Sequence, residues 1–398
     1  MKAIMYRAGS IGRGFIGALF SEIGYEVVFI DVNDEVVKII NQKHTYPQII
    51  MNKEKTTNWI KNIRAVDGKD TKAVSNEIAD ADILATAVGA NVLNRIAPVI
   101  AQGLLKRWKK DPENALDLLI CENLMDADVL LRKYLLNALP KQYHPIMEKQ
   151  LGLVETSIGR MVPPADPSFI SKDEHPLAVH VEPYDFLPVD KAAFKGNIPA
   201  YKKIIAYEPF HYFLERKLYV HNMAHVTTAF LGQFLHKTYI DEAANNIYIQ
   251  KIVKGCMMES CMMLAQKYNI NFAELNSHMD DLLHRFKNPY LKDTVSRVAR
   301  DPIRKLKPSD RLIGAARSCE KVNITPIYIS FAIALALSFM NGEEPKCLMK
   351  EICKIQEEEP LFQRILYFYD KIMIKDISLS DLVSIIDDLQ ANIRGEIV

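Results

Sequence analysis

Short apolar runs alternate with amphipathic stretches over roughly the first 190 residues, the pattern of alternating strands and helices. Four runs have the length and apolar content of buried strands: 2–6, 26–32, 82–88 and 116–123. The stretches 14–24 and 34–44 have helical spacing. Two later runs, 151–159 and 177–184, look like extensions of the same sheet. The pattern predicts a parallel α/β sheet with helices packed against it.

The pattern changes near Tyr207. From there almost to the end of the chain, apolar residues recur every three or four positions and strand signals disappear. Residues 208–237 are predicted to form one long helix, with Gly232 as its weak point. The apolar run 326–340 is too short for a membrane span, which needs about 20 residues, and is predicted to be a buried helix. We therefore expect a sheet domain at 1–199 and an all-α C-terminal domain at 200–398.

A glycine-rich loop follows the first predicted strand. The motif G-x-G-x-x-G binds dinucleotides because its first glycine permits a tight turn, its second lets the pyrophosphate approach, and its third lets helix and strand pack closely. Here the three positions hold Arg7, Gly9 and Gly12. Asp31 ends the second strand, where a carboxylate accepts hydrogen bonds from the ribose hydroxyls and repels the 2′-phosphate of NADP. The order of these elements predicts a Rossmann-type α/β domain that binds NAD.

The expected cofactor-binding residues lie in this loop and just after later strands. They are Gly9, Ser10, Ile11, Gly12, Arg13, Gly14, Asp31 and Val88. Arg7 either tilts away from the turn, crowds the path of the cofactor or bonds a phosphate oxygen. We favour crowding, in which case Arg7→Gly tightens NADH binding. A cofactor-impaired binding or regulatory protein that keeps the fold is the alternative from a different functional class.

The segment KLYVHNMAHV at 217–226 carries candidate chemistry. At about 100° per residue, Lys217, His225 and Asn222 lie at about 0°, 80° and 140° around a helix and share one face. Hydride transfer from an alcohol needs a base for the hydroxyl proton and donors for the developing oxyanion. Lysine with a pKa lowered by burial suits the base, asparagine the donor, and histidine the substrate or proton path. His221 and His225 are spaced like some zinc ligands, but no HExxH motif or third ligand accompanies them, so no metal is predicted.

Almost the whole chain resembles the polyol-specific long-chain dehydrogenases. The resemblance rests on AGSIGRGFIG (8–17), TAVGANVLNRIAPVIAQGL (86–104), CENLMDA (121–127), GRMVPP (159–164), ERKLYVHNMAH (215–225) and NPYLKDTVSRVARDPIRKL (288–306). The K-x4-N-x2-H signature is the most specific of these. The chain departs from the family at Arg7 and at Gly159, which replaces an acidic residue before Arg160 and so bears on the support of that arginine.

The resemblance implies an NAD-dependent dehydrogenase that works without zinc. It assigns the general base to Lys217 and matches Asn222 and His225 to the asparagine and histidine of the family signature. It also identifies Asn123, at the end of the strand 116–123, as a second oxyanion-binding asparagine.

Positive charge is concentrated at 286–311, and arginine forks bind phosphate oxygens well. The resemblance makes Arg297 and Arg300 substrate contacts, with Lys305 behind them. The reaction that it implies is the interconversion of D-mannitol 1-phosphate and D-fructose 6-phosphate. Because arginine also binds carboxylates, a hexuronate or an unphosphorylated hexitol is the alternative substrate.

Charge and cysteine content narrow the range of partners. The formal net charge of +1 gives no general attraction to nucleic acid or to an anionic membrane. The six cysteines form no CxxC pair, which is typical of free thiols in a reducing compartment. The first strand runs straight into the glycine loop, so no signal peptide is predicted. We expect a cytoplasmic enzyme with a small-molecule substrate, and its oligomeric state stays open.

Overall fold

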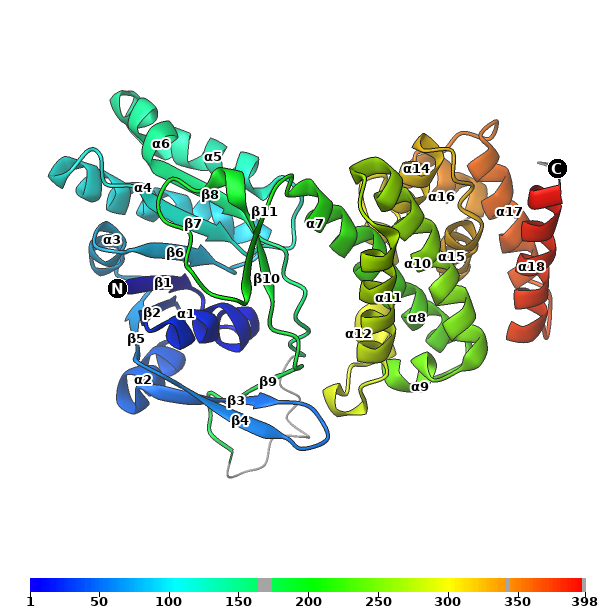
Figure 1. Cartoon of the computed structure of the whole chain (residues 1–398), viewed down its shortest axis with the longest axis horizontal. Coiled ribbons are helices and arrows are strands. Elements are labelled where there is room, and N and C mark those ends of the chain that lie inside the picture. Colours follow the sequence, from blue (N-terminus) through cyan, green and yellow to red (C-terminus); the bar gives the residue numbers. More distant parts are fainter. Residues whose placement is uncertain (164–173, 341–343, 396–398) are drawn as a thin grey trace. The chain divides into compact units, whose positions relative to one another are not determined.

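The computed structural model describes residues 1–163, 174–340 and 344–395. Two compact units divide the chain, Met1–Leu214 and Glu215–Val398. Figure 1 shows strands and helices in the first unit and helices in the second. The division lies later than the predicted boundary after residue 199, because β11 (Ile204–Tyr207) pairs with β10 (Leu187–Asp190) and so belongs to the first unit.

Six parallel strands form the main sheet of the first unit, in the order β5-β2-β1-β6-β7-β8 (Figure 1). They are β1 (Lys2–Tyr6), β2 (Glu26–Asp31), β5 (Ile63–Asp67), β6 (Ile83–Thr86), β7 (Leu116–Ile120) and β8 (Leu151–Glu155). Numbered within the sheet, this is the order 3-2-1-4-5-6 of doubly wound dinucleotide-binding sheets. The predicted Rossmann-type fold is therefore confirmed. The strand order reverses between β1 and β6.

Both faces of this sheet are buried, because successive side chains of a strand point to opposite faces. Along β1, Ala3 and Met5 pack into one hydrophobic core, and Ile4 and Tyr6 pack into the other. The helices of this unit are α1 (Gly17–Ile23), α2 (Asp34–Lys43), α3 (Thr71–Ala79), α4 (Leu93–Lys110), α5 (Ala127–Ala138) and α6 (His144–Gln150). The predicted helices at 14–24 and 34–44 correspond to α1 and α2.

The prediction for 177–184 was wrong about the sheet that this run joins. Its residues form β9 (Val179–Val181), which pairs with β3 (Thr45–Ile50) in a separate sheet completed by β4 (Thr56–Lys61). The sequence pattern also missed β5. That strand lies at the edge of the main sheet and contains Arg64 and Asp67, so it is not an unbroken apolar run.

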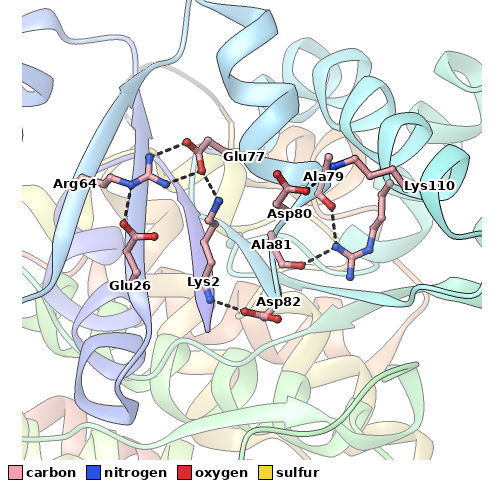
Figure 2. A network of polar contacts seen from close by, with 10 residues as sticks. Lys2, Glu26, Arg64, Glu77, Ala79, Asp80, Ala81, Asp82 and Lys110 are labelled. Atoms are coloured by element: carbon pink, nitrogen blue, oxygen red, sulfur yellow. Dashed lines mark hydrogen bonds and ion pairs between the residues drawn. The ribbon is translucent and has the colours of Figure 1, made fainter.

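Ion pairs tie the amino ends of three strands to α3, as Figure 2 shows. Arg64 of β5 donates two hydrogen bonds of 2.7 Å to Glu77 of α3 and one of 2.8 Å to Glu26 of β2. Lys2 of β1 also reaches Glu77, at 2.9 Å. Such sheets bind ligands at the carboxyl ends of their strands. This network lies at the opposite, amino end of the sheet and so away from the expected ligand site.

The second unit is built of helices over its described residues (Figure 1). They are α8 (Met223–Phe234), α9 (Ile240–Ala244), α10 (Ile247–Tyr268), α11 (Phe272–Phe286), α12 (Val295–Ala299), α13 (Pro302–Lys305), α14 (Ile313–Lys321), α15 (Ile327–Ser338), α16 (Pro345–Glu351), α17 (Pro360–Ile372) and α18 (Leu379–Gly395). The predicted buried helix at 326–340 is confirmed, because α15 is buried from Ile327 to Leu337. Within the described ranges, no helix combines the length and apolar character needed to cross a membrane.

The predicted helix at 208–237 changes its hydrogen-bond pattern along its length. It consists of α7 (His211–Glu215), the π-helical turn η5 (Arg216–Asn222) and α8. Gly232 does not end it. A Cβ atom there would lie 2.9 Å from Val295 of α12 and 3.0 Å from Ala243 of α9. This glycine is therefore a point of close helix packing rather than a weak point.

Candidate active site

The glycine loop connects β1 to the π-helical turn η1 (Gly12–Ile16), which α1 continues. The N–H of Arg13 donates to the carbonyl of Gly9 at 2.9 Å. The N–H groups of Ser10, Ile11 and Gly12 precede this first helical bond and lie at the helix start. A Cβ atom on Gly12 would overlap the carbonyl oxygen of Arg7, so the turn needs glycine there. This is the backbone geometry with which helix starts bind anions.

Asp31 holds the loop in place from the end of β2. Its Oδ2 accepts a hydrogen bond of 2.8 Å from the N–H of Ala8, and its Oδ1 accepts one of 2.9 Å from the N–H of Asn33. A carboxylate oxygen accepts about two hydrogen bonds. Asp31 can therefore support the loop and still accept from a ribose hydroxyl.

Glu122 organises the neighbouring loop after β6. The sequence analysis did not predict this role. Its two carboxylate oxygens accept from the N–H groups of Val88 at 2.9 Å and Gly89 at 2.7 Å. Glu122 is buried, whereas the next residue, Asn123, is exposed just beyond the carboxyl end of β7. The role of Glu122 could have been suspected from the sequence, because an acidic residue there follows an apolar strand almost directly.

Two of the expected cofactor-binding residues face the protein interior. The Nε of Arg13 donates to the carbonyl of Ala8 at 2.6 Å, its Nη1 donates to the carbonyl of Leu177, and burial lowers its pKa. The carbonyl of Gly14 accepts from Gln48 at 2.9 Å and from Arg160 at 3.2 Å. The part of the loop that remains turned toward a ligand is therefore Gly9 to Gly12.

Arg160 has support in spite of the glycine that precedes it. Its Nε donates to the carbonyl of Glu182 at 3.0 Å, and its guanidinium lies 5.6 Å from the ring centroid of Phe15. Burial lowers the pKa of Arg160 to about 10. Pro164, the last residue of the GRMVPP segment, lies outside the described residues.

Lys217 and Asn222 lie in η5, so the uniform spacing of 100° assumed above does not apply to them. The N–H of Met223 donates to the carbonyl of Leu218, five residues earlier, which is π-helical bonding. A π-helical turn holds more than four residues, so each residue advances by less than 100° around the axis. Lys217 and Asn222 are therefore closer to one face than the predicted 140°, and His225 follows in α8.

Exposure to solvent distinguishes a few residues of this helix. Between Tyr219 and Gly232 every residue is buried except Asn222 and His225, and just before this stretch Arg216, Lys217 and Leu218 are partly exposed. Lys217, Asn222 and His225 are therefore partly accessible on a mostly buried segment. This arrangement suits proton transfer to or from a bound ligand.

Asp293 connects His225 to Arg297. The Nε2 of His225 lies 3.0 Å from Oδ2 of Asp293, an ion-pair distance without the alignment of a good hydrogen bond. Arg297 donates from Nε and Nη2 to the two oxygens of Asp293, at 2.7 Å each. Burial alone raises the pKa of Asp293, but His225 and Arg297 outweigh it and lower that pKa below its ordinary value. Asp293 is only 8% exposed, and the sequence analysis did not identify it as a site residue.

The other two predicted substrate contacts lie in different surroundings. Arg300 is exposed, has no polar partner among the described residues and lines a cavity of about 630 Å³ with Lys237, Thr294 and Ser296. Lys305 is buried, its Nζ lies 3.4 Å from the carbonyl of Asp301, and burial lowers its pKa to about 8. The structure therefore brings Arg297 to His225, turns Arg300 into the cavity and buries Lys305.

His221, which lies four residues before His225, is buried. Its ring centroid lies 6.2 Å from that of His225, and burial holds its pKa well below the ordinary value. Over the described stretches of the chain, no three His, Cys, Asp or Glu side chains are grouped so as to hold a metal ion.

Comparison with known proteins adds to this geometry. Residues 1–203 match the model of the mannitol dehydrogenase Rossmann domain, and residues 210–392 match that of the mannitol dehydrogenase C-terminal domain. A mannitol-1-phosphate 5-dehydrogenase of Thermoanaerobacter pseudethanolicus is 35% identical over 394 residues, which are 98% of this chain and 94% of that relative.

Solved structures share the fold at low sequence identity. A D-sorbitol dehydrogenase in substrate-free form has a TM-score of 0.78 at 14% identity, covering 96% of this chain and 95% of its own. The Pseudomonas fluorescens mannitol 2-dehydrogenase, in a ternary complex with NAD and D-mannitol, has a TM-score of 0.72 at 14% identity, covering 96% and 94%. The two family models cover most of the chain and the relative is 35% identical over 98% of it, so the chain belongs to the mannitol dehydrogenase family.

Proposed function

We propose that this chain is an NAD-dependent dehydrogenase that interconverts D-mannitol 1-phosphate and D-fructose 6-phosphate. Family membership and the relative that is 35% identical over 98% of the chain support this reaction. When bound, the nicotinamide of NAD supplies or accepts the hydride at C4, in exchange with C5 of the polyol. Residues 1–199 bind the cofactor in this proposal, and residues 200–398 bind the substrate and move the proton.

The first unit offers a site that fits a dinucleotide. The helix start at Ser10 to Gly12 presents N–H groups to the pyrophosphate, and Asp31 accepts from the adenosine ribose. Val88 and Gly89, held by Glu122, border the site at the end of β6. Because the carboxylate of Asp31 repels a 2′-phosphate, NADH is preferred over NADPH.

The observation that carries the reaction type is the accessible set Lys217, Asn222 and His225 on the buried helix. Lys217 takes the hydroxyl proton during oxidation and returns it during reduction. Asn222 donates a hydrogen bond to the oxygen on which negative charge develops. Asp293 keeps His225 oriented toward the substrate.

The positive segment favours a phosphorylated substrate over a neutral hexitol. Arg297 already binds a carboxylate, and it positions Asp293 and His225 in this proposal. Arg300 is free to bind a ligand phosphate, with Lys237 and the hydroxyls of Thr294 and Ser296 beside it in the cavity. Lys305 adds positive charge to this segment from a buried position.

Steady-state reduction by NADH tests the substrate. We expect kcat/KM for D-fructose 6-phosphate to exceed that for D-fructose and for hexuronates by about 10²-fold or more, since a charge-assisted contact to phosphate is worth about 1.5–3 kcal/mol and several are present. Arg300→Ala should raise KM for D-fructose 6-phosphate and leave D-fructose kinetics unchanged. Equal or better turnover of a hexuronate would contradict the proposed substrate and favour a hexuronate oxidoreductase.

Substitution of Lys217 tests the base. Lys217→Met should lower kcat by about 10²–10⁴-fold and leave NADH binding near the wild-type value, since general-base catalysis contributes that much. The matched control is Lys254→Met, because Lys254 is an exposed lysine of α10. A loss below about tenfold would remove Lys217 from the mechanism.

A further inference from the structure

The side chain of Arg7 crosses the point where the strand order of the main sheet reverses. Arg7 follows β1 and Val88 follows β6, and these two strands are neighbours. The Nη1 of Arg7 donates to the carbonyl of Val88 at 3.0 Å. Doubly wound sheets bind ligands at this reversal, outside the carboxyl ends of the strands. Arg7 thus spans the place where a dinucleotide is expected.

The backbone at Arg7 keeps the shape that a glycine would give it. Its φ of 77° lies in the left-handed region, which a non-glycine residue adopts at a free-energy cost. Its N–H still donates to the carbonyl of Ile30 at 2.7 Å, and its carbonyl oxygen still lies against Gly12. The arginine therefore leaves the turn intact. Any effect of Arg7 on cofactor binding must come from its side chain and not from a displaced backbone.

The guanidinium group lies over the part of the loop that a pyrophosphate approaches. A Cβ atom on Gly9 would lie 3.2 Å from the Nε of Arg7, and Gly9 occupies the position where the absence of a side chain admits the phosphates. Of the five N–H donors of Arg7, one binds Val88, and no carboxylate pairs with the group among the described residues. Arg13 is not an alternative cation, because its side chain points inward.

We infer that Arg7 is a phosphate-binding residue of the cofactor site. Its spare donors bind the diphosphate of the dinucleotide and add a positive charge to the N–H groups of Ser10 to Gly12. Val88, held by Glu122, keeps the guanidinium in position before the cofactor arrives. The inference rests on the dinucleotide class of the ligand and does not depend on which polyol is oxidised.

Titration of NADH fluorescence with the full-length protein, without substrate, tests this role. Arg7→Gly and Arg7→Gln should each weaken NADH binding about ten- to a hundredfold, and Arg7→Lys should weaken it less. Binding by the first two variants should also depend less on salt than binding by the wild type. Arg132→Gln is the matched control, since this partly exposed arginine of α5 pairs with Glu148 and should change neither property.

Two further measurements separate the outcomes. ADP-ribose, which has the diphosphate but no nicotinamide, should show the same loss of affinity in Arg7→Gly. The melting temperature of Arg7→Gly should stay near the wild-type value, because glycine relieves the strained φ but gives the unfolded chain more freedom. Tighter binding by Arg7→Gly would establish crowding by the side chain, and unchanged binding would establish that it points away; both overturn the inference. Absence of NADH binding in the wild type would instead refute the cofactor itself.

Discussion

At the scale of single residues, several side chains of the site serve the backbone and a ligand together. Asp31 accepts from two N–H groups of its own loops, so its carboxylate position does not depend on the cofactor. Asp293 binds two candidate site residues and is almost fully buried. Removing either carboxylate should change both the local structure and the binding or turnover of a ligand. Substitutions that keep the shape but change the charge can separate these two effects.

Asp31→Asn should reduce the preference for NADH over NADPH. The amide keeps one acceptor oxygen but no longer repels the 2′-phosphate, so the dissociation constant for NADPH should fall while that for NADH rises. Asp31→Ala should weaken both, since it also frees the N–H groups of Ala8 and Asn33. Fluorescence titration with the two nucleotides measures this. An unchanged ratio in Asp31→Asn would show that the ribose is not bound here.

Asp293→Asn should lower kcat/KM by about 10²-fold, because loss of the charge lets His225 and Arg297 move from their positions. Asp293→Glu should restore part of the activity, because it returns the carboxylate charge. Steady-state kinetics with the two variants measures this. An unchanged kcat/KM in Asp293→Asn would show that the charge of Asp293 is not needed.

At the scale of elements, the apolar helix α15 begins on a buried carboxylate. Glu259 of α10 accepts from the N–H groups of Tyr328 at 2.8 Å and Ile329 at 3.0 Å. Burial raises the pKa of Glu259 to about 8, although these hydrogen bonds oppose the shift. Its folded pKa lies above the unfolded value, so its contribution to stability is fully present below about pH 4.5 and is lost as pH rises toward 8.

Glu259→Gln should flatten this dependence. The amide oxygen still accepts one N–H but cannot ionise, so the decline in the free energy of unfolding between about pH 5 and 8 should be smaller than in the wild type. Urea unfolding at several pH values measures it. Glu274→Gln, on the exposed surface of α11, is the matched control. A decline as steep as that of the wild type would show that another group is responsible.

At the scale of the whole molecule, each unit carries different candidate residues of the proposed reaction. The glycine loop, Asp31 and Glu122 belong to the first unit, and Lys217, His225 and Asp293 belong to the second. Because Lys217, and not a metal ion, moves the proton in the proposed reaction, the whole protein should reduce its substrate at an unchanged rate after dialysis against EDTA. A loss of activity that Zn²⁺ restores would contradict the proposed proton transfer by Lys217.

Much of the architecture follows from local patterns in the sequence. The strands at 2–6, 26–32, 82–88 and 116–123, the glycine loop and the change to helical spacing are each carried by a few consecutive residues, so periodicity reveals them. Edge strand β5 escaped detection because Arg64 and Asp67 interrupt its apolar run. The strand β9 was expected, but nothing local specifies which sheet a short strand joins.

The sequence by itself determined the order of strand, glycine loop, helix and Asp31, and which polar residues interrupt the buried helix. Only the tertiary structure decided how those residues are used. The π-helical turn that brings Asn222 toward Lys217, the inward direction of Arg13, and the positions of Glu122 and Asp293 depend on contacts between segments far apart in the chain. Arg7 shows the difference most clearly. Its place in the motif is local information, but its effect depends on a carbonyl 81 positions later.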